Sequence, residues 1–349
     1  MSGSAAGVEP GNPAPGGAQR SARHEPVLPT PRGHLSSAVT QALSGGGASA
    51  LLDRDPIVAV EAYSDDLQLA LYTCYELHYR SFAGVDGQWE WDPDLLRFRG
   101  EMERAFLTAL HRDVVPSNDI GQALEPLLAE PLEAEGVSQH LRDIGEMWQL
   151  REHIAMRSLY HLKEADPHAW VIPRLTGQAK ASLVAVEYDE FGAGRPARAH
   201  SQLFAGLMAG LGLDTRYGYY LDAAPAEMIA TVNLMSLLGL HRSLRGALVG
   251  HFAAAEITTA PSARRMTRAL ERLGAPDACL TFYLEHVEAD AVHEQVMRHD
   301  VIGDLVSREP DLGPSIVFGI DATTWLEGRV TAHLLTSWDR GQSSLRTRG

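Results

Sequence analysis

Apolar side chains recur at spacings of three and four residues through most of the chain. In residues 93–111, for example, Leu95, Phe98, Met102 and Phe106 follow this spacing, which places them on one face of an α-helix. No stretch shows the convincing alternation of apolar and polar residues that a half-buried strand requires. The pattern predicts helices over residues 35–43, 65–82, 93–111, 139–164, 175–191, 197–211, 224–240, 243–259, 262–273, 278–299 and 321–336. Since no internal repeat of roughly 20–50 residues is present, a solenoid is disfavoured and the predicted fold class is an all-α helical bundle.

The N-terminal residues 1–30 differ in composition from the rest of the chain. They are rich in Gly, Ala, Ser and Pro and contain almost no large apolar side chains. Such a segment cannot bury enough surface to offset the entropy lost on ordering, so we expect a disordered tail. A chain of 349 residues with 45% hydrophobic residues can bury a large core, and we expect residues 31–349 to form a single helical domain.

Charge and cysteine content limit the classes of partner and the compartment. The formal net charge is −15, and no stripe of Lys and Arg is present that would neutralise phosphates, so we expect no nucleic-acid partner. Cys74 and Cys279 lie far apart in apolar helical contexts, which is typical of reduced thiols and indicates a cytoplasmic protein. No apolar run has the length of a membrane span, and the N-terminus lacks the order of a signal peptide. We therefore expect a small-molecule substrate and no membrane partner, and a homodimer stays open.

Three potential metal ligands share one helix near the C-terminus. His286, Asp290 and His293 stand at positions i, i+4 and i+7. At about 100° per residue their side chains project within roughly 60° of one another. Zn, Fe and Mn all accept imidazole and carboxylate ligands. This face therefore indicates either a metal site or a solvated polar face, and the helix alone does not decide between them.

Four more candidate ligands lie in other predicted helices. Glu256 stands among small apolar residues, where an unpaired buried carboxylate would be costly and needs a cation, a proton or a charged partner. Glu164 is expected in the last turn of the helix that Pro167 ends. Glu190 closes one predicted helix and His200 opens the next, so the two side chains are expected to face each other across a tight turn.

These residues, in this order, carry a resemblance to a known family. The segments are Lys163-Glu164-Ala165-Asp166-Pro167-His168, Ile172-Pro173-Arg174-Leu175, Asp189-Glu190-Phe191-Gly192, His200, Glu256, and the stretch from Glu285 to His293. Together they resemble the heme-oxygenase-like diiron oxidases, also called iron-containing redox enzymes, over about residues 65–335. The resemblance is closest to members with three histidines, which include enzymes that oxygenate nitrogen atoms. It implies a helical bundle that binds two iron ions and activates O2, with a ligand set of Glu164, Glu190, His200, Glu256, His286, Asp290 and His293.

Charge balance agrees with two metals rather than one. The four carboxylates of this set contribute −4 and ligating imidazoles are neutral, so two Fe(II) ions would bring the site to neutrality. A single catalytic zinc uses about three protein ligands and leaves most of the set unexplained. Ferritin-like diiron bundles repeat a Glu-x-x-His doublet, which occurs nowhere in this chain. A heme site would need one axial histidine and not this number of interior carboxylates.

The sequence leaves three functions open. The first is an O2-dependent non-heme diiron oxygenase that oxidises a small amine-bearing substrate, with N-oxygenation favoured and an external electron donor implied. The second is a diiron oxidase that cleaves or desaturates C–C bonds of an amino acid or fatty acid. The third is a metal-binding protein without turnover.

Several polar residues close to the candidate ligands are left out of the predicted set. Glu187 and Asp189 flank Glu190, but charged residues near a helix end are more often solvated than in contact with a site. His161, His168 and His251 are interpreted as ordinary core or surface histidines.

Overall fold

The computed structural model describes residues 25–51, 60–129 and 135–346, except for the side chains of Glu288, Asp290 and Ala291. Within these ranges the chain forms helices and no strands, so the predicted all-α fold is confirmed. The α-helices, in chain order, are α1 (His34–Gln41), α2 (Asp65–Glu76), α3 (Pro93–Asp113), α4 (Ile120–Leu128), α5 (Val137–Asp143), α6 (Met147–His161), α7 (Asp166–Ala169), α8 (Gly177–Glu190), α9 (His200–Gly210), α10 (Ala226–Leu240), α11 (Arg245–Arg272), α12 (Thr281–Gln295), α13 (Asp304–Arg308) and α14 (Gly313–Asp339). A π-helical segment, Val296–Gly303, joins α12 to α13.

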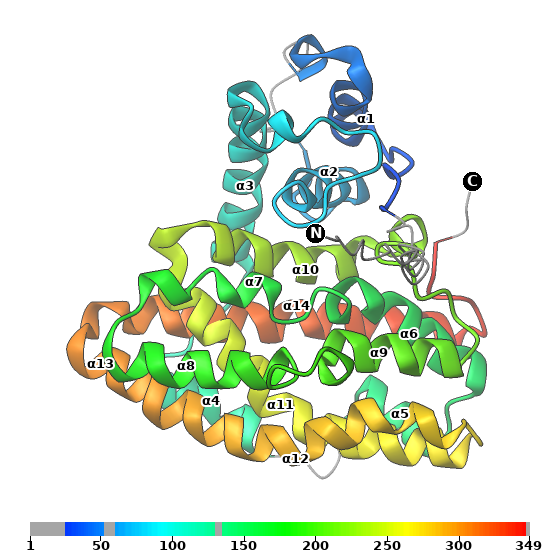
Figure 1. Cartoon of the computed structure of the whole chain (residues 1–349), viewed down its shortest axis with the longest axis vertical. Coiled ribbons are helices and arrows are strands. Elements are labelled where there is room, and N and C mark those ends of the chain that lie inside the picture. The colour runs from blue at the N-terminus through cyan, green and yellow to red at the C-terminus, as the bar shows by residue number, and fades with distance from the viewer. Residues whose placement is uncertain (1–24, 52–59, 130–134, 347–349) are drawn as a thin grey trace, which may run out of the picture.

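The long helices of the C-terminal half lie beside one another, and α1, α2 and α3 cover one side of them (Figure 1). Helix α10 is apolar nearly all round and buries almost every residue, as expected for a helix at the centre of a bundle. One buried apolar cluster joins α1, α2 and α3 to α10, α11 and α14. A second joins α6, α9 and α12 to the other side of α10.

Helices α11 and α14 approach each other unusually closely. A Cβ atom added to Gly250 would lie 2.1 Å from the carbonyl oxygen of Ile316. One added to Gly319 would lie 1.9 Å from the carbonyl oxygen of Ala247. Real Cβ atoms do not tolerate such distances, so only glycine permits the two backbones to meet here.

Several predicted helices differ from those of the structure. The helix predicted over residues 139–164 is two helices, because the backbone N–H groups of Ile144 and Gly145 both bond to the carbonyl of His140 and end α5. The helices predicted over 243–259 and 262–273 are one, since α11 continues through Pro261 while packing against α12 and α14. Helix α4 was not predicted, although Asp119 caps it by accepting a hydrogen bond from the N–H of Gln122.

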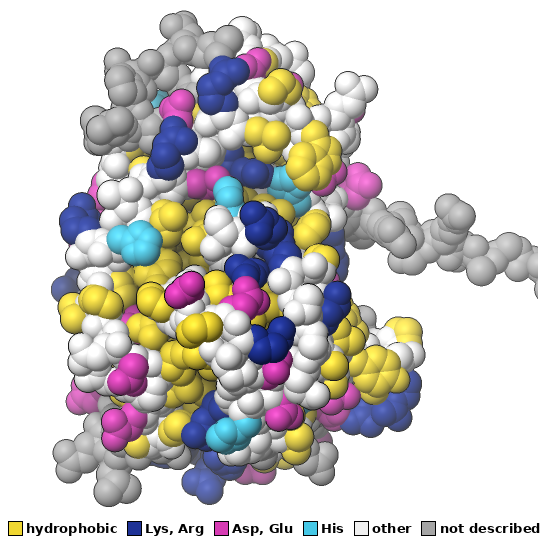
Figure 2. All heavy atoms as spheres, turned by 90° about the vertical axis from the view of Figure 1, so that its left-hand side faces the viewer, with side chains coloured by type: hydrophobic (Ala, Val, Ile, Leu, Met, Phe, Trp, Pro, Cys, Tyr) yellow, Lys and Arg dark blue, Asp and Glu magenta, His cyan; other side chains and the backbone are white. Residues whose placement is uncertain are grey.

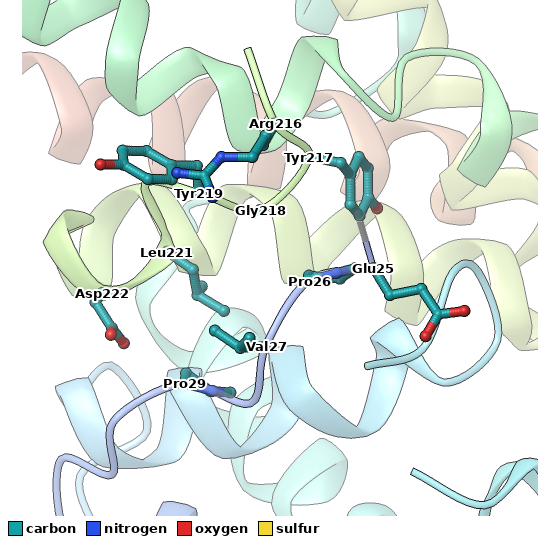
Figure 3. A pocket seen from close by; sticks show the side chains of 10 residues that line it. All are labelled: Glu25, Pro26, Val27, Pro29, Arg216, Tyr217, Gly218, Tyr219, Leu221 and Asp222. Carbon is teal, nitrogen blue, oxygen red and sulfur yellow. The ribbon is translucent and has the colours of Figure 1, made fainter. Parts of the chain in front are cut away.

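Residues 1–24 of the expected N-terminal tail lie outside the described residues. Pro26 accepts a hydrogen bond from the N–H of Ala83, and the Thr30 N–H donates to Asp222. Residues 25–29 and the loop before α10 line a surface pocket of about 240 Å³, with Pro26, Val27 and Tyr217 on its walls (Figure 3).

Both cysteines are buried and do not form a disulfide with each other. No helix in the described part of the chain is long and apolar enough to cross a bilayer. The face at the left of Figure 1 carries acidic and basic side chains intermixed around a central apolar strip (Figure 2).

Candidate metal centre

The turn between α8 and α9 brings Glu190 and His200 together, as predicted. Gly192 sits in this turn with φ of 78°, and a Cβ atom there would lie 2.5 Å from the carbonyl oxygen of Arg195. Glycine therefore permits the tight reversal. His200 Nδ1 lies 2.8 Å from Glu190 Oε2, and both side chains are buried.

His286 and His293 share the inward face of α12, and each is 3% exposed. The side chain of the third predicted ligand on this helix, Asp290, lies outside the described residues. The structure thus shows the positions of six of the seven predicted side chains.

Those six side chains form two clusters. Glu164, His200 and His286 form the first cluster, and Glu190, Glu256 and His293 form the second. Within each cluster, one potential ligand atom from every residue lies within 4.8 Å of the others. Glu190 lies between the clusters, because its Oε2 faces His200 and its Oε1 lies 3.7 Å from His293 Nδ1.

Glu164 reaches the first cluster from a position that differs from the prediction. Helix α6 ends at His161, and Glu164 lies in the turn that follows it. Burial opposes its ionisation, but His161, 3.0 Å away, and His286, 3.9 Å away, hold the pKa of Glu164 well below its usual value. The carboxylate is therefore charged and available to a cation.

The hydrogen bonds of His286 determine which of its nitrogens faces the cluster. Its Nδ1 lies 2.7 Å from the carbonyl oxygen of Phe282. A carbonyl only accepts, so Nδ1 carries the proton and Nε2 keeps a lone pair. Nε2 is the nitrogen that faces Glu164, which is the orientation of a metal-ligating histidine held from behind by a backbone carbonyl.

His293 is placed between carboxylates on both sides. Its Nδ1 lies 3.1 Å from Glu256 Oε2, and its Nε2 lies 3.3 Å from Asp189 Oδ2. Burial disfavours the charged ring, but the hydrogen bond to Glu256 and the charges of Glu256 and Glu190 outweigh burial and raise the pKa of His293 to about 9. Without metal, a proton thus supplies the positive charge that the second cluster requires.

Two residues that the sequence analysis left out lie at this centre. Asp189 is in contact with His293, although its side chain is 53% exposed. Glu187 is 2% exposed and neither of its carboxyl oxygens has a hydrogen-bond partner among the described residues. Burial, followed by the charges of Glu190 and Glu256, raises the pKa of Glu187 to about 9, so it is protonated at neutral pH.

His161 was interpreted as an ordinary histidine, but its contact with Glu164 places it beside the first cluster. By contrast, His168 stacks on Phe252 and His251 bonds to Thr323, so these two are buried packing residues. The only sequence signal for the role of His161 was its spacing: it follows Arg157 by four residues and precedes Glu164 by three, and residues at such spacings are neighbours on a helix surface.

A cavity of about 330 Å³ opens onto the first cluster. It lies between α5, α6, α11, α12 and α14, and both His161 and Glu164 are in its wall. The wall mixes apolar side chains with polar ones, and the polar ones include His153, Arg157, Tyr160, Thr258, Thr323 and Glu327. Arg157 and Glu327 form a two-pronged ion pair there. Its size and few converging polar groups are typical of a small-molecule site.

A second hollow, of about 390 Å³, also borders the centre. Its wall includes Asp189 and His200, together with the ion-paired Arg198 and Glu285. Of these two cavities, the first has Glu164 in its wall and the second has Asp189 and His200.

Imidazole and carboxylate oxygen are ligands that iron accepts. The two clusters offer three of each, with Glu190 in a position to contact two ions. The described donor set therefore fits iron.

Comparisons with known proteins agree with this chemistry. Residues 151–328 match the family described as iron-containing redox enzymes. The chain is also similar to nitrosourea synthase of Streptomyces achromogenes subsp. streptozoticus, with 28% identity over 165 residues. That alignment covers 46% of this chain and 34% of the relative, so the similarity spans about a third of the relative's length.

Proposed function

Because the chain belongs to the iron-containing redox enzymes, we propose that it is an O2-dependent diiron oxygenase that oxidises a small amine-bearing substrate at nitrogen. The ligands would be Glu164, His200 and His286 for one iron, and Glu190, Glu256 and His293 for the other, with Asp290 as the seventh ligand. Bound Fe(II) would supply the redox chemistry with O2, with electrons from an external donor.

The observation that carries this proposal is the convergence of the two clusters around Glu190. Glu190 comes from the end of α8, and its two oxygens face imidazoles from α9 and α12. A carboxylate in this position can bridge two metal ions, which two-metal sites hold roughly 3.5–4 Å apart. A single-metal site would not need both clusters.

The polar groups in the cavity wall support the choice of substrate class. Threonine hydroxyls, His153 and the Arg157–Glu327 pair offer hydrogen bonds to a polar molecule. His153 Nδ1 has no hydrogen-bond partner among the described residues, and a long aliphatic chain would leave it so, at a cost. The wall therefore favours a small polar amine over a fatty acid.

The chain's own residues would orient the ligands of the centre. The carbonyl of Phe282 and the carboxylate of Asp189 hold the rings of His286 and His293. Protonated Glu187 is a buried acid beside Glu190 and Glu256, so it can hold a proton close to the clusters without adding negative charge.

The test is anaerobic titration with Fe(II), followed by exposure to ¹⁸O2 with a panel of small amines and amino acids. We expect two iron ions per chain and a product that retains every carbon and gains ¹⁸O on nitrogen. Release of carbon dioxide or an aldehyde would instead support C–C cleavage. Iron that binds but does not react with O2, or failure to bind two ions, would refute the proposal.

A further inference from the structure

We propose that a buried ion pair between Lys163 and Glu76 positions Glu164 for iron, so that helix α2, which lies outside the family-matched segment, is part of the metal-binding machinery. The inference rests on the assignment of Glu164 as an iron ligand under the proposed function. It concerns how that ligand is held.

Lys163 and Glu76 form the most deeply buried ion pair among the described residues. Lys163 Nζ lies 2.6 Å from Glu76 Oε2, and each side chain is 1% exposed. The two residues are 87 positions apart in the sequence. Glu76 is the last residue of α2, and Lys163 directly precedes Glu164.

Three tyrosines surround the lysine ammonium group. The ring centres of Tyr79, Tyr72 and Tyr217 lie 4.3, 4.7 and 5.9 Å from Nζ. Cations are attracted to aromatic faces at such distances, most strongly where water is excluded. The hydroxyl of Tyr217 also donates to Glu76 Oε2 at 3.1 Å. The ammonium group is therefore fixed from several directions.

The backbone next to Glu164 needs such fixing. Ala165 has φ of 72° and is 1% exposed. A residue with a Cβ atom is disfavoured in this region and stays there only when its surroundings impose it. The turn is thus not determined by local preference, and the Lys163–Glu76 contact is a long-range restraint on it.

Lys163 and Glu164 leave this turn in different directions. Lys163 contacts α2 and the loop before α10, whereas Glu164 contacts His161 and His286 in the first cluster. A restraint on the first side chain therefore fixes the backbone from which the second side chain reaches the metal position. Outer residues that orient a ligand typically contribute about 10–100-fold to metal affinity.

The experiment uses the full chain with His293→Ala as background, so that the first cluster is the site that is measured. Anaerobic Fe(II) affinity is compared with and without Glu76→Gln. We expect Glu76→Gln to weaken binding about tenfold or more. The matched control is Glu103→Gln. It removes a buried carboxylate on α3 that pairs with Arg99 and His241, and it should leave iron affinity unchanged.

Equal affinities with and without Glu76→Gln would overturn the inference. If Glu76→Gln does not fold, the double variant Lys163→Met with Glu76→Leu replaces the pair by apolar groups, which cores commonly tolerate. This variant should fold and still bind iron weakly, and wild-type affinity in it would also overturn the inference. An unmodified chain that binds no iron would instead refute the proposed function.

Discussion

Among the described residues in contact with the candidate metal centre, Asp189 is the most exposed, and its removal tests whether that contact matters. Asp189 Oδ2 lies 3.3 Å from Nε2 of His293, whose Nδ1 faces Glu256. With a metal bound as proposed, Nε2–H would donate to the carboxylate and Nδ1 would be the ligand atom. Asp189→Asn removes the charge and keeps the size of the side chain.

The expected effect follows from the exposure of this carboxylate. Replacing the outer partner of a ligating histidine typically lowers metal affinity about 10–100-fold. Because the Asp189 side chain is 53% exposed, solvent screens part of its charge and the lower limit applies. We expect a loss of about tenfold, or about 1.4 kcal/mol, in the affinity of the second cluster for Fe(II).

The assay is anaerobic Fe(II) titration in a His286→Ala background, which leaves the second cluster to be measured. Glu285→Gln is the control, because Glu285 lines the same hollow as Asp189 but pairs with Arg198. Asp189→Asn should weaken binding and Glu285→Gln should not. If both variants bind iron as the background does, Asp189 is only a solvated carboxylate and the assignment of the His293 nitrogens is wrong.

Three further predictions concern the turn, the core and the cavity. Ala165→Gly should stabilise the fold by about 1 kcal/mol in urea unfolding, because glycine tolerates the positive φ of this residue. A loss of stability would show that the backbone at Ala165 is not strained. Burial lowers the pKa of His251 from 6.5 to about 4, so the unfolded state binds a proton that the folded state does not. Stability should therefore fall as the pH drops from 6.5 to 4, by about 3 kcal/mol from this residue. His251→Asn should lack that part of the pH dependence, and an unchanged profile would refute it. Ala255→Phe should fill the cavity beside Glu256 and raise KM for the amine while two iron ions still bind; an unchanged KM would mean that the substrate binds elsewhere.

Local patterns predicted the parts of the centre that local geometry determines. His286 and His293 share a helix face because the helical period puts them there. Glu190 and His200 meet because a glycine turn joins their helices. Each of these pairs is separated by at most ten residues, and over such a distance the geometry of the helix or turn decides which side chains lie close together.

Contacts between distant segments were not predictable in the same way. Asp189 touches a residue 104 positions away and Lys163 one 87 positions away. Which charged residue at the end of α8 points inward depends on how the helix is rotated in the bundle, and packing decides that rotation. Glu164 was placed in a helix that in fact ends three residues earlier. The continuation of α11 through Pro261 likewise reflects packing that outweighs a local helix breaker.

The glycine contact between α11 and α14 limits how this protein can be redesigned. Gly250 and Gly319 leave no room for even one methyl group at the crossing, so a larger residue at either position would push the two helices apart. Helix α11 also supplies Glu256 and one wall of the cavity. A library meant to change the specificity for the proposed amine substrate should therefore vary the α5 and α6 side of the cavity and leave the two glycines untouched.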